Sequence, residues 1–93
     1  MHIQYAWDET KRQSNLKIHG LDFADVNRVF SNFTFTFEDM RFDYHEQRFV
    51  SLGLLDGLVV AIVHTETADT VRIISLRKAS KREQTICFTQ VQN

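Results

Sequence analysis

The sequence VRIISLRKASKRE, residues 71–83, indicates a β-strand that runs directly into a helix. Ser80 followed three residues later by Glu83 is a capping box, the signature of a helix N-terminus. This stretch contains five basic residues and one acid, Glu83; the basic residues are Arg72, Arg77, Lys78, Lys81 and Arg82. So much positive charge at one strand-to-helix junction predicts a site for phosphate, and hence for RNA.

The chain before this stretch contains a strong hairpin signal. Two predicted strands, residues 47–55 and 58–65, are joined by Asp56-Gly57, a dipeptide typical of a type I′ turn. A two-residue turn pairs Phe49 with His64 across the hairpin. Because the second strand begins LVVAIV and is apolar on both faces, it is expected at the centre of the sheet.

Capping residues mark two helices in the first third of the chain. Asp8 is a good N-cap for the first helix, and Gly20 is the expected left-handed residue at its end. Asp22 caps a second helix, and further short strands are predicted at residues 3–7 and 33–37. The sequence therefore predicts one α+β domain over residues 1–93, a twisted antiparallel sheet of about four to five strands. Two N-terminal helices and a C-terminal helix are expected to pack on one side of this sheet.

The composition limits the classes of protein that this chain can belong to. A formal net charge of −1 and a pI near 6.4 mean that any nucleic-acid binding must come from local clusters of charge. Cys87 is the only cysteine, and the four histidines have no paired ligand spacing, so no metal site and no cofactor are expected. No signal peptide and no membrane-length apolar run is visible, which predicts a cytoplasmic protein.

Two longer motifs resemble a known family. The pattern WDxxKxxxNxxxHG occupies residues 7–20, and RIISxRKAS occupies residues 72–80. Between them lie Glu46-x-Arg48, Leu52-Gly53 and Val63-x-Thr65. In this order and at these separations, the motifs resemble the BrnT toxins of type II toxin–antitoxin systems over residues 5–83.

The resemblance implies a compact ribonuclease fold of the RelE kind and metal-independent cleavage of RNA that inhibits translation. It also implies a BrnA-like antitoxin, a ribbon-helix-helix protein that neutralises the toxin. The complex of the two proteins would repress their shared operon, so that the toxin meets operator DNA only through the antitoxin.

Metal-free cleavage of RNA needs a base, a proton donor and cations to stabilise the charged phosphorane. We interpret Arg77 as the principal cation, because its planar guanidinium can hold two phosphate oxygens; the alternative is that it only pairs with Glu83. His45, Glu46 and Arg48 are the other predicted catalytic residues and supply an acid/base pair. The alternative for Glu46 and Arg48 is an ordinary ion pair on one face of a strand.

The remaining basic residues are predicted to bind RNA phosphates: Arg72, Lys78, Lys81 and Arg82. The alternative for Arg72 is a solvated side chain, and the alternative for the other three is contact with the antitoxin. His64 and Ser80 are candidate supporting residues, and a buried histidine that serves only as a hydrogen-bonded core residue is the alternative for His64. Two other functions stay open at this point. The chain could be a catalytically weak interaction module that acts as co-repressor with a DNA-binding partner, or a nucleic-acid binder without chemistry.

Overall fold

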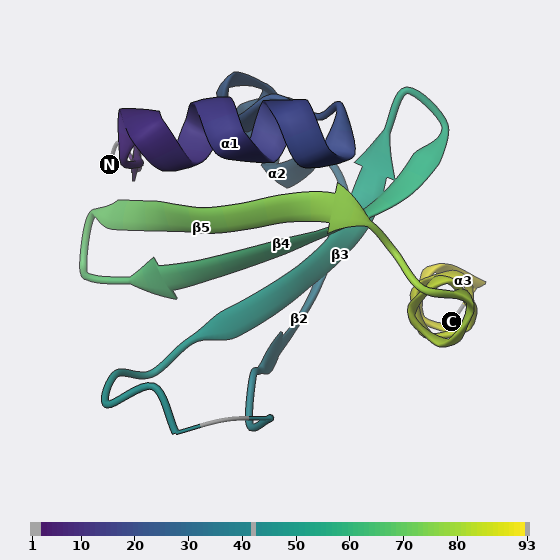
Figure 1. The fold of residues 1–93 in the computed structure, drawn as a ribbon. Helices are drawn as coiled ribbons and strands as arrows, with labels where there is room; N and C mark the ends of the chain where they lie inside the picture. The colour runs from purple at the N-terminus through teal and green to yellow at the C-terminus, as the bar shows by residue number, and fades with distance from the viewer. Residues whose placement is uncertain (1–2, 42, 93) are drawn as a thin grey trace.

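A five-stranded sheet in the order β1-β5-β4-β3-β2 forms the centre of the structure, a computed structural model that describes residues 3–41 and 43–92. Three helices and a short 3-10 helix surround the sheet (Figure 1). In chain order the elements are β1 (Gln4–Ala6), α1 (Glu9–His19), the 3-10 helix η1 (Phe23–Asp25), α2 (Val26–Phe30), β2 (Phe35–Glu38), β3 (Phe49–Leu55), β4 (Leu58–Glu66), β5 (Thr70–Lys78) and α3 (Lys81–Gln92). The side chains of residues 91 and 92 are not described.

The predicted hairpin and helix caps are confirmed. Asp56 and Gly57 have φ angles of 52° and 82°, as a type I′ turn requires, and Phe49 pairs with His64. Asp8 accepts a hydrogen bond from the backbone N–H of Lys11, and Gly20 ends α1 with a φ of 70°. These features depend only on neighbouring residues, which is why the sequence alone predicts them.

The sheet is antiparallel except at one edge. The pairs β2–β3, β3–β4 and β4–β5 are antiparallel, whereas β1 pairs with β5 in parallel, with Tyr5 beside Val71. Parallel strands cannot be joined by a tight turn, and here the whole remaining domain connects the two strands. The predicted α+β fold with an antiparallel sheet is confirmed, with this parallel edge as the one departure from it.

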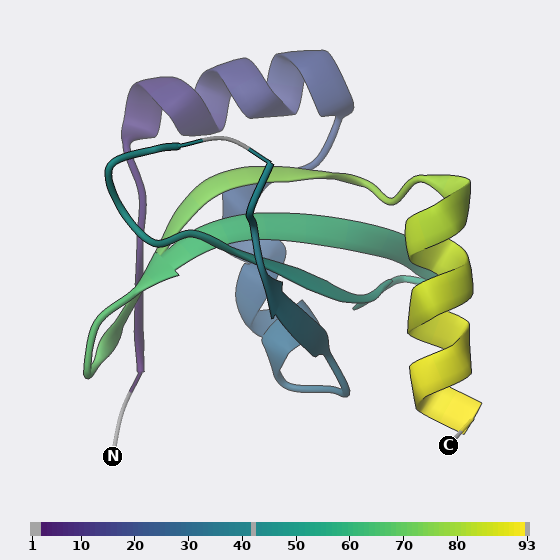
Figure 2. The ribbon, with the colours of Figure 1, turned by 90° about the horizontal axis from the view of Figure 1, so that it is seen from below.

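The helices cover both faces of the sheet, so the expectation that all of them pack on one side is wrong. We call the face covered by α1, η1 and α2 the α1 face, and the opposite face, where α3 packs over β3 and β4 at one end, the α3 face (Figures 1 and 2). The core of the α1 face includes Phe23, Val26, Val29, Val60, Ile62, Ile73 and Leu76. The core of the α3 face includes Val50, Leu52, Val59, Ala61, Val63 and Cys87. Because β4 is apolar on both sides, each face needs its own cover.

A β-bulge decides which side chains of β5 reach the α3 face. Val63 pairs with Ser75, but the next residue, His64, pairs with Ile73, so β5 contains one extra residue at Ile74. In a regular strand, residues five positions apart lie on opposite faces. The bulge shifts this alternation, and Arg72 and Arg77 both lie on the α3 face.

Gly53 packs directly under α2, and alanine at this position is expected to destabilise the fold by about 1–3 kcal/mol. A Cβ atom here would lie 2.7 Å from Cγ1 of Val29 and 3.1 Å from Cγ2 of Thr34. Val29 and Thr34 are both β-branched, so their χ1 rotamers are restricted. Neither side chain can move away without disturbing the core of the α1 face. Urea unfolding of Gly53→Ala measures the loss in free energy of unfolding.

The matched control is the double variant Gly53→Ala with Val29→Ala, which removes the atom that the new methyl group would meet. Its destabilisation should be less than the sum of the two single variants. If the destabilisation of the double variant equals the sum of the two single variants, the contact with Val29 is not the cause of the loss in Gly53→Ala.

Candidate active site

A carboxylate between two arginines forms the most distinctive polar cluster on the α3 face. Oε2 of Glu46 accepts a hydrogen bond from Nε of Arg48 at 2.9 Å, and Oε1 lies 3.8 Å from Nη1 of Arg72. Arg48 immediately precedes β3 and Arg72 belongs to β5, so Glu46 bridges across the central strand β4. The side chains of Glu46 and Arg72 are 37% and 48% exposed, which leaves the cluster open to a ligand. We call these three residues the Glu46 cluster.

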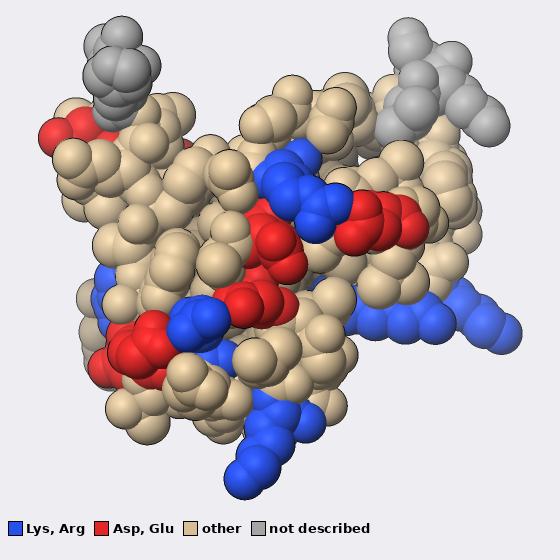
Figure 3. All heavy atoms as spheres, turned by 90° about the horizontal axis from the view of Figure 1, so that it is seen from above, with Lys and Arg blue, Asp and Glu red and all other residues tan. Residues whose placement is uncertain are grey.

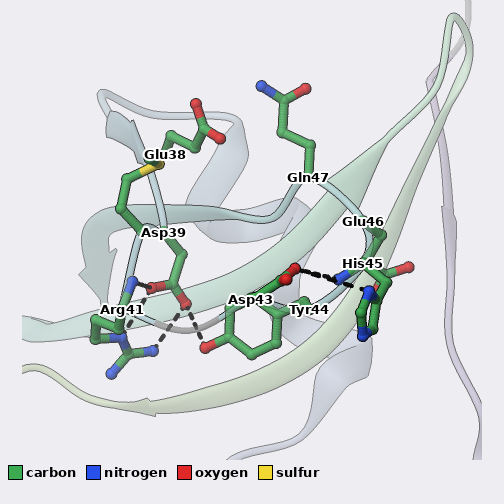
Figure 4. Close-up of a pocket in the computed structure, with 9 residues that line it drawn as sticks. Glu38, Asp39, Arg41, Asp43, Tyr44, His45, Glu46 and Gln47 are labelled. Carbon is green, nitrogen blue, oxygen red and sulfur yellow. Dashed lines mark hydrogen bonds and ion pairs between the residues drawn. The ribbon is translucent and has the colours of Figure 1, made fainter.

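Residues of the loop between β2 and β3 contact the Glu46 cluster through Tyr44. The carboxylate of Asp39, whose side chain is only 1% exposed, accepts hydrogen bonds from Nε and Nη2 of Arg41 and from the hydroxyl of Tyr44 (Figure 4). The guanidinium of Arg48 lies over the Tyr44 ring, 4.0 Å from its centroid. A chain of contacts therefore runs from the buried Asp39 through Tyr44 to Arg48 and Glu46.

The bonds from Arg41, together with the hydroxyl of Tyr44, lower the pKa of Asp39 to about 2, against the opposing effect of burial. The carboxylate therefore stays charged at every physiological pH. Sequence analysis missed Asp39, Arg41 and Tyr44, because they lie in an irregular loop where no periodicity tells which side chains turn inward.

His45 lies apart from the cluster that it was predicted to join. Its side chain is 90% exposed, and its nearest acidic partner is Asp43, with 3.9 Å between Nδ1 and the carboxylate (Figure 4). Its φ of 59° is in the left-handed region that non-glycine residues rarely adopt. In the part of the chain that the structure describes, no hydrogen bond or ion pair joins His45 to Glu46 or Arg48.

Arg77 is held by Glu83, the alternative that the sequence left open. Its Nη1 and Nη2 donate to the two carboxylate oxygens of Glu83 at 2.7 and 3.0 Å. Glu83 also accepts from the backbone N–H of Ser80 at 2.9 Å, while the Ser80 hydroxyl accepts from the N–H of Glu83, which confirms the capping box. The bonds from Arg77 lower the pKa of Glu83 to about 2, so the pair is fully charged.

Arg77 and the Glu46 cluster occupy different parts of the α3 face. Five residues of β5 separate Arg77 from Arg72, which corresponds to about 16 Å along the strand. Arg77 lines a hollow of about 520 Å³, which we call the α3 hollow, together with Phe37, Arg41, Ser80, Arg82, Glu83 and Ile86. The structure thus groups Glu46 and Arg48 with Arg72, and Arg77 with Ser80 and Arg82. Lys78 and Lys81 are exposed at the same end of β5.

His64 lies on the α1 face, on the other side of the sheet from Glu46. It is fully buried, its Nε2 is 2.7 Å from the hydroxyl oxygen of Ser51, and the rings of Phe30 and Phe49 pack against it. Nδ1 lies 3.4 Å from a carboxylate oxygen of Glu66, but it makes no hydrogen bond. This is the core histidine that the sequence left as the alternative to a supporting role.

Burial lowers the pKa of His64 from its ordinary 6.5 to about 4, and this predicts a loss of stability in mild acid. The unfolded chain takes up a proton on this histidine near pH 6.5 and the folded chain does not. Stability is therefore full above pH 6.5 and falls as the pH drops toward 4, by up to about 1.4 kcal/mol per pH unit. Urea unfolding between about pH 7 and about pH 4.5 measures the slope.

His64→Gln is the control, because glutamine can still bond Ser51 but does not titrate. Its free energy of unfolding should be nearly flat above about pH 5, and a slope equal to that of the wild type would assign the effect to other groups. Asp39 and Glu83 contribute only at the acid end of the window, because their pKa values are lowered from 3.8 and 4.5 to about 2 and their contribution is lost as the pH falls below about 5. This loss is shared by the wild type and His64→Gln, so the difference between their slopes measures His64.

The α1 face carries charges of both signs side by side (Figure 3). Arg12 pairs with Glu9 and Asp22, each at 2.7 Å, and Arg28 pairs with Asp25 and Asp56. These arginines are already neutralised by acids of the same chain. Among the residues that the structure describes, the exposed basic side chains without an ion pair are Lys11 and Lys17 on α1 and Lys78, Lys81 and Arg82 around the junction of β5 and α3.

The described part of the chain contains no metal-binding group of side chains and no membrane-spanning helix. Within residues 3–41 and 43–92, no three His, Cys, Asp or Glu side chains gather closely enough to bind a metal ion. None of the helices in these ranges has the length and the apolar character needed to cross a lipid bilayer.

The fold and the comparison with known proteins together define the class of this chain: it is a ribonuclease toxin of a type II toxin–antitoxin system. The family model described as "Ribonuclease toxin, BrnT, of type II toxin-antitoxin system" matches residues 7–83, so the chain belongs to the BrnT family. The match includes every residue predicted for the site, as well as Asp39, Arg41 and Tyr44.

A solved structure supports the same conclusion. The crystal structure of the Brucella abortus ribonuclease toxin BrnT matches with a TM-score of 0.63 and 31% sequence identity, and the match covers 85% of this chain and 99% of that one. No curated protein matches the chain. The resemblance inferred from the two motifs is confirmed, and so is the predicted α+β domain.

Proposed function

We propose that the chain cleaves RNA without a metal ion and that the Glu46 cluster is its catalytic centre. Glu46 acts as the base that removes the proton of a ribose 2′-hydroxyl. Arg48 and Arg72 hold the phosphate and stabilise the negative charge that develops as the 2′-oxygen attacks it. The observation that carries this proposal is a half-exposed carboxylate bridging two arginines on the open α3 face of a ribonuclease toxin.

The proposed reaction forms the bond between the 2′-oxygen and phosphorus and breaks the bond from phosphorus to the 5′-oxygen. It leaves a 2′,3′-cyclic phosphate on one fragment and a 5′-hydroxyl on the other. The proton from the 2′-hydroxyl goes to Glu46, and the departing 5′-oxygen takes a proton from His45 or from water. His45, exposed at the tip of the loop, reaches the leaving group only if the loop moves toward the bound RNA.

The test is incubation of the purified chain with RNA in excess EDTA, with the ends of the fragments analysed. Fragments with cyclic phosphate ends support the proposal. Cleavage that appears only after a divalent metal is added would exclude the metal-free mechanism, but it would still show that the chain is a ribonuclease.

Intact RNA under both conditions would instead favour the alternative, an interaction module that acts as co-repressor with a DNA-binding partner. One observation supports this alternative: the arginine at the end of β5 is already neutralised by Glu83 in a chain of net charge −1.

We also propose that a BrnA-like ribbon-helix-helix antitoxin neutralises the toxin by covering the basic end of β5, and that the pair represses its own operon. The family implies an antitoxin, and the exposed residues Lys78, Lys81 and Arg82 offer it a charged surface. A toxin that cuts RNA to inhibit translation acts in the cytoplasm. Gel-shift experiments on operator DNA test the repression, because the complex should bind and the toxin alone should not.

A further inference from the structure

The α3 hollow lies on the same face of the sheet as the Glu46 cluster, toward α3, and it combines basic and apolar groups. Its basic residues come from three elements: Arg41 from the loop after β2, Arg77 from β5 and Arg82 from α3. Phe37 of β2 and Ile86 of α3 add apolar surface, and both are half-buried. We propose that this hollow binds a nucleotide that flanks the cut, with its phosphate against Arg41 and Arg82 and its base against Phe37 and Ile86. The inference rests on the proposed ribonuclease function.

Charge indicates that an RNA strand runs toward α3 rather than over the neighbouring loop. The lining of the α3 hollow contains three arginines and one glutamate, a formal charge of +2, which falls to +1 when Asp39, the partner of Arg41, is included. A second hollow of about 660 Å³ lies within the loop of residues 38–47 (Figure 4). Its lining contains Arg41 against Glu38, Asp39, Asp43 and Glu46, a formal charge of −3. A polyanion that leaves the Glu46 cluster is therefore attracted to the first hollow and repelled by the second.

Two of the three arginines are held in place before any ligand arrives. Asp39 binds Nε and Nη2 of Arg41, and Glu83 binds both terminal nitrogens of Arg77. Nη1 of Arg41 and Nε of Arg77 are not used in these bonds. Fixing a guanidinium in advance reduces the side-chain entropy that is lost when a phosphate binds. Arg82 is exposed and makes no ion pair with any residue that the structure describes, so it contributes its full charge.

The apolar part of the hollow suits a base rather than a second phosphate. Phe37 packs beside Phe35, with 5.9 Å between the ring centroids, and these rings adjoin the core of the α3 face. Stacking of a base on an aromatic ring is tolerant of sequence and contributes roughly 1–3 kcal/mol per base. Because about 16 Å of β5 separates Arg72 from Arg77, a dinucleotide bound at the Glu46 cluster is too short to fill the hollow, whereas a hexanucleotide can reach it.

The experiment uses fluorescent oligouridines of two and six nucleotides whose 2′-O-methyl groups prevent cleavage. Affinities are measured by anisotropy for the wild type, Arg82→Ala and Phe37→Leu. Each substitution should weaken the hexanucleotide complex by about 3- to 10-fold and leave the dinucleotide complex unchanged. Arg82→Ala should also reduce the salt dependence of hexanucleotide binding by about one phosphate contact. Lys17→Ala is the control, because this exposed lysine is on α1, across the sheet, and should have no effect.

The outcomes separate the two proposals. If the wild type cleaves RNA but both variants bind the hexanucleotide as tightly as the wild type does, the hollow is not a nucleotide subsite and the ribonuclease proposal stands. If both variants lose antitoxin binding while RNA binding is unchanged, the hollow belongs to the antitoxin and the inference is overturned. A wild type that neither cleaves RNA nor binds the hexanucleotide overturns both. Melting temperatures of the variants show whether Phe37→Leu disturbs the fold, and Arg82→Ala carries the test if it does.

Discussion

Replacement of Glu46 by glutamine is expected to slow RNA cleavage by about 100- to 1,000-fold while the melting temperature stays that of the wild type. Glutamine has the same shape as glutamate but cannot accept the proton of the 2′-hydroxyl. It also removes the negative charge between Arg48 and Arg72, which leaves both guanidiniums free for phosphate. Substrate binding should therefore be retained or tightened while turnover is lost. Single-turnover cleavage of labelled RNA in EDTA, with KM and kcat determined separately, measures both effects.

Glu38→Gln is the matched control, because it makes the same change of charge at the last residue of β2, where the loop to β3 begins. Glu38 is exposed and lines the acidic loop hollow rather than the Glu46 cluster. Its variant should keep the activity of the wild type to within a few fold. If the two variants lose the same amount of activity, the effect comes from the negative potential of the loop. If Glu46→Gln keeps full activity, Glu46 is not the base. Expression in cells gives a parallel readout. A toxin that cleaves RNA should arrest growth when expressed without its antitoxin, and Glu46→Gln should relieve this arrest whereas Glu38→Gln should not.

Local sequence signals account for most of the fold. The Asp56-Gly57 turn, the Asp8 cap and the capping box at Ser80 each depend on residues within a few positions of one another, and all three are present in the structure. The side of the sheet on which α3 packs was not predictable in this way. Cys87 and Ile86 of α3 join the apolar cluster on the second face of β4, and this tertiary contact has no local signal in the sequence.

The candidate site shows the same division between local and long-range information. The sequence places Glu46 and Arg48, two residues apart, at the start of a strand and predicts that they share a face. In the structure β3 begins at Phe49, so both residues lie in the loop just before it, where Glu46 still bonds Arg48. The approach of Arg72 to Glu46 depends on the strand order of the sheet, which no local signal in the sequence specifies. The bulge at Ile74 cannot be predicted from the sequence either. Without it the alternation of β5 would place Arg77 on the α1 face, opposite to Arg72.

Asn15 connects the first helix to the last strand in a way that explains its place in the WDxxKxxxNxxxHG motif. Its side chain is buried, and Nδ2 donates to the carbonyl oxygens of Leu21 and Leu76 at 3.0 and 2.8 Å. Oδ1 accepts from the backbone N–H of Leu76 at 3.2 Å. β1 pairs only with residues 70–72 of β5, so no strand lies beside Leu76 on that edge. The side-chain amide of Asn15 bonds the N–H and the C=O of Leu76 in place of such a strand. It thereby fixes α1 over the end of β5 that leads to Arg77.

Asn15→Asp is expected to lower the free energy of unfolding at neutral pH by roughly 2–5 kcal/mol, the largest effect on stability that we predict. The carboxylate cannot donate to the two carbonyl oxygens and faces both of them as a buried negative charge. These surroundings raise the pKa of the new carboxyl above its value in the unfolded chain, so the penalty is full at neutral pH and shrinks as the pH falls. Urea unfolding at pH 7 and pH 5 measures both predictions, with Asn27→Asp on the exposed side of α2 as a control that should change stability by no more than about 0.5 kcal/mol. A small effect that does not vary with pH would mean that α1 is held to β5 by apolar contacts alone.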